Sequence, residues 1–258
     1  MLLVFDVGNS ETTLGLFEGE VLRAHWRIVT DASRTPDEIG LLLRGLLGAK
    51  GVTPDKVSGV AIGSVVPGIN DALADACHDL SGERPLMVDA RSPLPITLDV
   101  LEPMTVGADR IINTLAASRL YAADTIVVDL GTATTYDCIT ADGVFLGGVI
   151  APGIRTSAET LFRRTSKLPA TELVPPLKTI GRRTEECIRS GVVFGSAEAL
   201  DGIVRRIKAE WPTGREPGVV ATGGLAPMIA PICSSVDRVE PHLTLIGLRL
   251  AHEILSVR

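Results

Sequence analysis

Aromatic side chains and an excess of positive charge are what this sequence has least of. Phe, Trp and Tyr make up 3% of its 258 residues, and the formal net charge at pH 7 is −6. Few rings are therefore available to stack on nucleobases, and no overall positive charge attracts a phosphate backbone. We expect no nucleic acid among the partners of this protein.

Long hydrophobic runs and paired cysteines are also missing. No stretch approaches the roughly 18 consecutive apolar residues of a membrane-spanning helix, and no basic leader precedes the first predicted strand. Cys77, Cys138, Cys187 and Cys233 are scattered without a CxxC pair, which favours buried thiols in a reducing compartment over disulfides or a zinc site. We expect a cytoplasmic protein with no membrane partner. Its hydrophobic fraction of 45% can supply the cores of two domains.

A short apolar run that ends in Asp, Gly and hydroxyl residues is the most informative stretch present. Residues 126–135 read IVVDLGTATT, which predicts a buried strand followed by a turn. Asp129 falls where the strand ends, and Gly131 lets the backbone approach a ligand closely. The hydroxyl residues and N–H groups of such a turn suit a phosphate, and the neighbouring carboxylate then implies a cation between them. One such motif could equally be an ordinary strand and polar hairpin.

The chain begins with a second copy of this pattern. Residues 2–13 read LLVFDVGNSETT, again a strand, an Asp, a Gly and a hydroxyl turn. A further strand-like segment follows each copy, and in both cases a turn signal comes next. Two copies about half a chain apart predict an internal duplication whose two turns close on one polyphosphate.

These motifs resemble the phosphate-1 and phosphate-2 motifs of the superfamily of acetate and sugar kinases, Hsp70 and actin. Within it, DVGNS at 6–10, GADR at 107–110, DLGTATT at 129–135 and GGVIAPG at 147–153 resemble type III pantothenate kinase. The resemblance implies an α/β fold of duplicated ribonuclease H-like (actin-like ATPase) domains, each a mixed sheet flanked by helices. We expect an N-terminal domain at residues 1–115 and a C-terminal domain at 116–258.

The resemblance also implies an activity, with its ligands. We expect ATP-dependent phosphorylation of the primary hydroxyl of pantothenate, the first step towards coenzyme A, with Mg²⁺, a monovalent cation (K⁺ or NH₄⁺) and a homodimer. Asp6 would lie near Mg²⁺–phosphate, and Asp129 would bind the monovalent cation. The segment expected around ATP comprises Asp6, Val7, Gly8, Asn9, Ser10, Glu11, Thr12 and Thr13, with Thr132, Gly223 and Gly224 from the second half.

Substrate residues are predicted by the same resemblance. Asp109 would act as the general base, although an Asp in a first helical turn also complements the helix dipole. Val100 stands where many members carry a Tyr that helps to hold pantothenate. Thr184 would contact substrate, and its place before a helical pattern also predicts an N-cap. The full expected set is Val100, Gly107, Ala108, Asp109, Arg110 and Thr184.

The rest of the chain alternates strand and helix patterns. Capping boxes at 35–38 and 156–159 predict helix starts, and the proline-containing segment 165–180 predicts an extended loop that could act as a lid. Two other functions stay open at this point. One is a non-catalytic regulator of the same fold that responds to a nucleotide or metabolite, and the other is a kinase for another hydroxylated substrate.

Overall fold

The computed structural model describes residues 1–256, and they form two compact units. Unit 1 consists of residues 1–116 together with the C-terminal helix from Leu243, and unit 2 consists of residues 117–242. The expected division at 115/116 placed the C-terminal helix in the second domain. Packing places it in unit 1 because its apolar face lies on strands of the unit 1 sheet.

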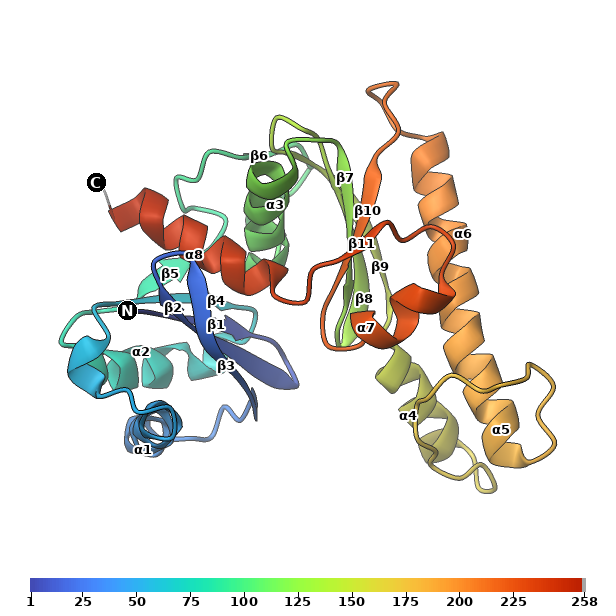
Figure 1. Ribbon diagram of the computed structural model, residues 1–258, viewed down its shortest axis with the longest axis horizontal. Coiled ribbons are helices and arrows are strands. Elements are labelled where there is room, and N and C mark those ends of the chain that lie inside the picture. Colours follow the sequence, from blue (N-terminus) through green and yellow to red (C-terminus); the bar gives the residue numbers. More distant parts are fainter. Residues whose placement is uncertain (257–258) are drawn as a thin grey trace. The chain divides into compact units, whose positions relative to one another are not determined.

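Unit 1 is built on a five-stranded sheet in the order β3-β2-β1-β4-β5 (Figure 1). The first three strands form an antiparallel meander, and β4 and β5 continue parallel to β1. The strands are β1 (Leu2–Val7), β2 (Glu11–Glu18), β3 (Val21–Val29), β4 (Gly59–Ser64) and β5 (Leu86–Val88).

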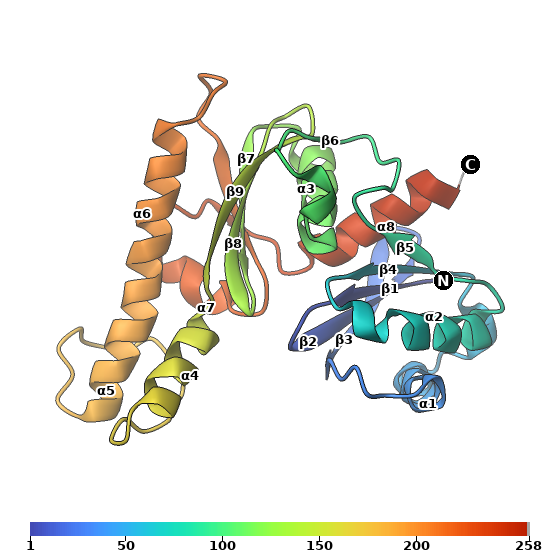
Figure 2. The same cartoon turned by 180° about the vertical axis from the view of Figure 1, so that it is seen from behind.

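Helices cover both faces of this sheet, as Figure 2 shows from behind. On one face α1 and α2 bury residues such as Leu43 and Leu73 against Phe5 and Ile62. On the other face, residues of α3 and α8 such as Ile112 and Leu248 pack in a separate core. The helices are α1 (Pro36–Gly48), α2 (Pro67–Ser81), α3 (Ala108–Tyr121) and α8 (Leu243–Ser256), with short elements η1 (Pro54–Lys56), β6 (Thr97–Leu98) and η2 (Pro103–Thr105) between them.

The strands of unit 2 repeat this topology in the order β11-β10-β7-β8-β9. An antiparallel meander of β7 (Thr125–Leu130), β8 (Ala133–Ile139) and β9 (Val144–Pro152) is followed by β10 (Gly218–Thr222) and β11 (Arg238–Val239), which run parallel to β7. The predicted duplication is therefore visible in strand order and direction, and the predicted fold class is confirmed.

One face of the unit 2 sheet is covered by a long continuous helical segment. It comprises α5 (Thr184–Arg189), a π-helical turn η3 (Ser190–Phe194) and α6 (Gly195–Ala209), and Leu200 and Val204 pack against Ile126 and Val128. The other helical elements of unit 2 are α4 (Ile154–Arg164), α7 (Ala226–Ile229) and η4 (Ala230–Ile232).

Local signals predicted some helix starts and missed others. The capping box at 35–38 is confirmed, because the Thr35 hydroxyl accepts the Glu38 N–H at 3.3 Å and Glu38 accepts the Thr35 N–H at 2.9 Å. The box at 156–159 is wrong, since α4 begins at Ile154 after Gly153. Thr184 is the first helical residue of α5 and not its N-cap, a position that Arg183 occupies.

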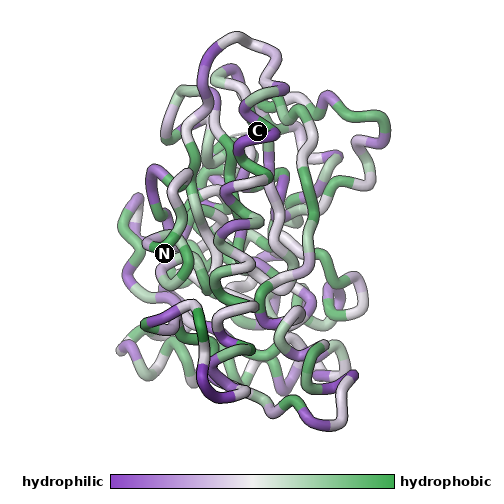
Figure 3. The backbone as a smooth tube through the Cα atoms, turned by 90° about the vertical axis from the view of Figure 1, so that its right-hand side faces the viewer, coloured by the Kyte–Doolittle hydropathy of each residue, from purple (hydrophilic) through white to green (hydrophobic). Residues whose placement is uncertain are grey.

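Hydropathy and irregular segments follow the remaining expectations. In Figure 3, hydrophobic stretches alternate with hydrophilic ones along the tube, as elements with one buried and one exposed face require. The segment 165–180 contains no regular element, which confirms the predicted loop. None of the helices within residues 1–256 has the length and apolar character needed to cross a membrane.

Candidate functional site

The turn after β1 is held in shape by a threonine from the end of β3. The Gly8 N–H donates to the Glu11 carbonyl at 3.1 Å and closes the turn. The Thr30 hydroxyl donates to the Gly8 carbonyl at 2.7 Å, and the Thr30 N–H donates to the Ser10 carbonyl at 3.0 Å. Thr30 was not predicted from the sequence, because a lone Thr before a loop carries no recognisable signal.

The same threonine also engages one of the predicted phosphate ligands. Thr12 is buried, and its hydroxyl lies 2.8 Å from the Thr30 hydroxyl. Because the Thr30 hydrogen is already donated to Gly8, Thr12 is the donor in this pair. Thr12 therefore supports the turn from inside, whereas Thr13, the next residue along the strand, has its side chain on the other face.

The N-terminus of α3 lies at the same edge of the unit 1 sheet as this turn. Asp6 pairs in register with Gly63 of β4, where an added Cβ would clash with Cδ1 of Ile112 in α3 and would touch the Cβ of Ala108 at 3.8 Å. A glycine at position 63 thus lets α3 approach the strand next to Asp6. Unit 1 brings together two predicted groups of residues, the segment 6–13 and the segment 107–110.

Asp109 is the only acidic residue in the first turn of α3, and its carboxylate bonds to the helix backbone. Oδ1 accepts the Arg110 N–H at 2.9 Å. Burial raises the pKa of the Asp109 carboxyl above its ordinary value, while the Arg110 N–H and the Arg110 guanidinium oppose that shift. A carboxylate with a raised pKa binds a proton more readily, which suits a general base.

A cavity of about 380 Å³ adjoins this helix start within unit 1. Its lining includes Ser64 at the end of β4, Arg91 after β5, and the backbone of Gly107 and Ala108. This volume lies in the range of small-molecule pockets, and the lining includes hydroxyls and the Arg91 guanidinium, which lies 4.0 Å from the carboxylate of Asp89. The cavity can therefore accept a small polar molecule beside the residue that precedes Asp109.

In unit 2 the turn after β7 is supported by α4 and β10. The Thr156 hydroxyl donates to the Thr132 carbonyl at 2.8 Å, and a Cβ on Gly153 would lie 2.6 Å from the Gly131 carbonyl oxygen. Gly223 follows β10 with φ +88°, and its Cα faces Oδ1 of Asp129. Asp129, Thr132 and Gly223, predicted separately, thus lie in one neighbourhood.

The residues around Asp129 provide oxygen ligands of the kind that a hard cation requires. Among residues 1–256, no three His, Cys, Asp or Glu side chains gather as a preformed metal cluster. A hard cation that is completed by phosphate oxygens, water and backbone carbonyls needs only one or two carboxylates. Asp129 offers one such carboxylate beside Gly223, and Asp6 occupies the equivalent strand position in unit 1.

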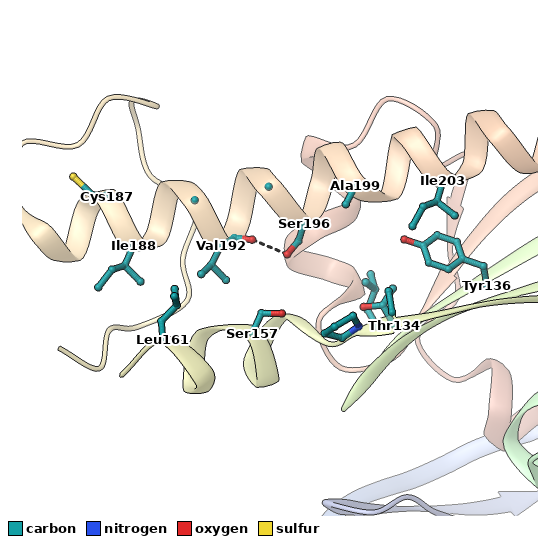
Figure 4. Close-up of a pocket in the computed structure, with 15 residues that line it drawn as sticks. Thr134, Tyr136, Ser157, Leu161, Cys187, Ile188, Val192, Ser196, Ala199 and Ile203 are labelled. Carbon is teal, nitrogen blue, oxygen red and sulfur yellow. Dashed lines mark hydrogen bonds between the residues drawn. The ribbon is translucent and has the colours of Figure 1, made fainter. Parts of the chain in front are cut away.

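A second cavity, of about 460 Å³, lies in unit 2 between the sheet, α4 and the helical segment 184–209 (Figure 4). Thr134, Ser157 and Ile188 line it, and the Ser196 hydroxyl donates to the Val192 carbonyl at 2.6 Å. None of its 15 lining residues carries a formal charge. The lining has no cationic side chain to attract phosphate and no carboxylate to bind an accompanying cation, so this cavity does not suit a polyphosphate. None of the predicted site residues lines it.

Thr184 and Val100 complete the predicted residues. Thr184 is exposed at the start of α5 in unit 2, and Val100 is partly buried in the segment of unit 1 that leads to α3. Gly224 is exposed and follows Gly223 after the buried end of β10. None of these three residues takes part in the hydrogen bonds and close contacts described above.

Two sheets of one topology, each with an Asp-x-Gly turn after its first strand, define the superfamily of acetate and sugar kinases, Hsp70 and actin. Solved structures agree on the fold: MreB 5 of Spiroplasma citri gives a TM-score of 0.57 at 10% identity, covering 99% of this chain and 97% of that one. A Campylobacter jejuni protein assigned to the Baf family of transcriptional activators gives 0.63 at 18% identity, covering 99% and 100%.

Sequence comparison identifies the family, which the fold alone does not. Residues 2–206 match the family model of type III pantothenate kinase. A type III pantothenate kinase of Anaeromyxobacter dehalogenans is 46% identical over 255 residues, and one of Moorella thermoacetica is 44% identical, each alignment covering 98% of this chain and 99% of the relative. The chain belongs to the type III pantothenate kinase family.

Proposed function

We propose that this protein transfers the γ-phosphoryl group of ATP to the primary hydroxyl of pantothenate, the first step of coenzyme A biosynthesis. The single observation that carries the proposal is Asp109, a carboxylate with a raised pKa at the start of α3, next to a cavity of small-molecule size. Family membership across nearly the whole chain identifies the substrate class.

Asp109 takes the role of general base in this proposal. As the substrate oxygen forms its bond to the γ-phosphorus, the bond from that phosphorus to the β,γ-bridging oxygen breaks and ADP leaves. The hydroxyl proton passes to Asp109. Because phosphoryl transfer has a loose transition state, the carboxylate mainly orients the hydroxyl and receives its proton late. Gly107, Ala108, Arg110 and Val100 would line the substrate, and Thr184 would contact it.

The two Asp-x-Gly turns hold the phosphates and their cations. Asp6 would be the carboxylate nearest Mg²⁺, whose chemistry is to neutralise charge that builds on the phosphate oxygens. Asp129 would bind a monovalent cation, K⁺ or NH₄⁺. Ser10, Thr13 and Thr132 would donate to phosphate oxygens, while Thr12 keeps the turn in shape through Thr30. Gly223 and Gly224 would let the nucleotide pack on backbone.

Oligomeric state and surroundings complete the proposal. We expect a homodimer acting in the cytoplasm on two small-molecule substrates, with neither nucleic acid nor membrane as a partner. Light scattering on the purified protein tests the dimer, for which the measured mass should be twice that of one chain.

The proposed activity is tested by measuring ADP release from ATP in the presence of Mg²⁺. The assay is run with and without pantothenate, in potassium buffer and again in sodium buffer. We expect turnover that requires pantothenate and potassium. Turnover in both buffers would keep the kinase and remove the cation assignment. No pantothenate-dependent turnover, with ATP still bound by calorimetry, would contradict the proposal and favour a regulator or a kinase for another substrate.

A further inference from the structure

The residue in front of α3 is a glycine, and its missing side chain leaves room for the Asp109 carboxylate. The Gly107 carbonyl accepts the N–H groups of Arg110 at 3.1 Å and Ile111 at 3.2 Å, which places Gly107 at the N-cap of the helix. Asp109 folds back over this end, so that its Oδ1 accepts the same Arg110 N–H at 2.9 Å. The helix thus uses an internal Asp in the place where an N-cap side chain would ordinarily lie.

A side chain at position 107 would compete for that space. A Cβ built on Gly107 lies 2.5 Å from Oδ1 of Asp109 and 3.6 Å from its Cγ, and on another side it lies 3.3 Å from Cγ1 of Val65. The first distance is well below a van der Waals contact, so one of the atoms must move. The distance to Cγ1 of Val65 is already short for two carbon atoms, so the backbone has little room to shift towards Val65. The carboxylate, which rotates about its own side-chain bonds, is the group that would be displaced.

Backbone strain does not explain the glycine. The glycines with positive φ include Gly19, Gly82 and Gly223, and Gly107 is not among them. Its backbone conformation is therefore open to an L-residue. Substitution at this position acts through the contact with Asp109.

We propose that Gly107 is a positioning residue, which by having no side chain lets the Asp109 carboxylate stay at the N-terminus of α3. This inference rests on the proposed function for its effect on turnover, because it assigns the reacting proton to Asp109. A general base must lie within hydrogen-bond reach of the proton it takes, and displacement by about 1 Å can cost on the order of 100-fold in rate.

Two variants with opposite effects on helix capping test the proposal. Gly107→Ala adds the Cβ alone. Gly107→Ser adds the same Cβ together with a hydroxyl that is a preferred N-cap group, so it should keep or raise the melting temperature. We expect kcat to fall about 10- to 100-fold in both, with KM for ATP within about twofold of the parent. The control is Gly40→Ala in α1, where nothing lies within 4 Å of an added Cβ and turnover should be unchanged.

A measurement that does not need turnover separates this inference from the proposed function. In protein labelled with ¹³C at the Asp carboxyl carbons, the Asp109 resonance is the one that Asp109→Asn removes. We expect this resonance to titrate at higher pH in Gly107→Ala than in the parent, because the carboxylate loses the Arg110 N–H and keeps its burial and the same Arg110 charge. Gly40→Ala should leave it unchanged.

Each outcome decides one of the two claims. A parent protein without pantothenate-dependent turnover contradicts the proposed function, while the carboxyl titration still decides the position of Asp109. An unchanged titration in Gly107→Ala overturns the positioning role. A kcat loss in Gly107→Ala that Gly107→Ser does not share also overturns the positioning role. Failure of both variants to fold overturns it too, because the proposal requires an intact helix with a displaced carboxylate.

Discussion

Oδ1 of Asp129 faces the Cα of Gly223, at the place that a Cβ on residue 223 would occupy. Asp129 of β7 pairs in register with Thr222, the last residue of β10, so the residue after Thr222 arrives beside the carboxylate. Gly223 has φ +88°, and a Cβ there would also lie 2.8 Å from the Leu130 nitrogen. The carboxylate therefore depends on a glycine from a distant part of the chain.

Gly223→Ala should damage both the fold and the site. We expect a loss of about 1–2 kcal/mol from the left-handed backbone and roughly 1–3 kcal/mol more from the crowding. The matched control is Gly214→Ala, where φ is +71° and nothing lies within 4 Å, so only the backbone cost applies. Denaturant unfolding gives both free energies, and calorimetry should show weaker ATP binding for Gly223→Ala alone. Equal losses in the two variants would contradict the contact with Asp129.

Asp129→Ala tests the proposed monovalent cation site. Removing the carboxylate should remove the difference in turnover between potassium and sodium buffers and leave a slower enzyme. Asp142→Ala, an exposed carboxylate in the turn between β8 and β9, serves as the control and should keep the parent's potassium response. A variant of Asp129 that potassium still stimulates would show that the ion is bound elsewhere.

Thr30→Val tests the support of the β1–β2 turn. Val keeps the shape of the side chain but cannot donate to the Gly8 carbonyl or accept from Thr12. Loss of these two hydrogen bonds, each worth about 0.5–1.5 kcal/mol, should raise KM for ATP by roughly fivefold or more, with a smaller effect on KM for pantothenate. Thr53→Val, at an exposed hydroxyl that caps no helix, should change neither constant. If KM for ATP stays constant in Thr30→Val, the turn does not depend on Thr30.

The repeated motif made the fold predictable, while long-range supports were not visible in the sequence. Asp6 and Asp129 each follow an apolar run and precede a Gly, so strand, turn and duplication could be inferred locally. Thr30 reaches the first turn through strand pairing with residues about twenty positions earlier, and no local pattern marks it. The packing of the C-terminal helix on the unit 1 sheet is likewise set by tertiary contacts.

Helix starts show where local rules fail. Thr35 and Glu38 form their predicted box because both side chains are exposed and free to reach the helix end. Thr156 has the same spacing to Glu159, yet its hydroxyl bonds to the Thr132 carbonyl of the turn after β7. A site contact thus replaces the capping contact, and α4 begins three residues earlier, with Gly153 at its N-cap.

Asp109→Asn should separate activity from stability. The amide oxygen can still accept the Arg110 N–H, but it cannot take a proton, so turnover should fall by about 100- to 10,000-fold with ATP binding retained. The parent carboxyl has a pKa raised by burial, so ionising it at neutral pH opposes folding. Asn removes that charge, and the melting temperature should rise. An Asn variant with parent activity would contradict the assignment of the base.

The pH dependence of turnover should follow the same carboxyl. As a base, Asp109 is active when deprotonated, and burial raises its pKa above the ordinary value of 3.8. Therefore kcat/KM for pantothenate should fall as the pH is lowered through that raised pKa, at higher pH than an exposed Asp would require. The free energy of unfolding should change in the opposite direction, because the folded state binds the proton of Asp109 more tightly than the unfolded state does. The ionised Asp109 destabilises the fold at neutral pH, and this destabilisation should disappear as the pH falls from the folded-state pKa towards 3.8. Unfolding curves of the parent and Asp109→Asn across this range should converge at the acidic end, and curves that stay parallel would contradict the raised pKa.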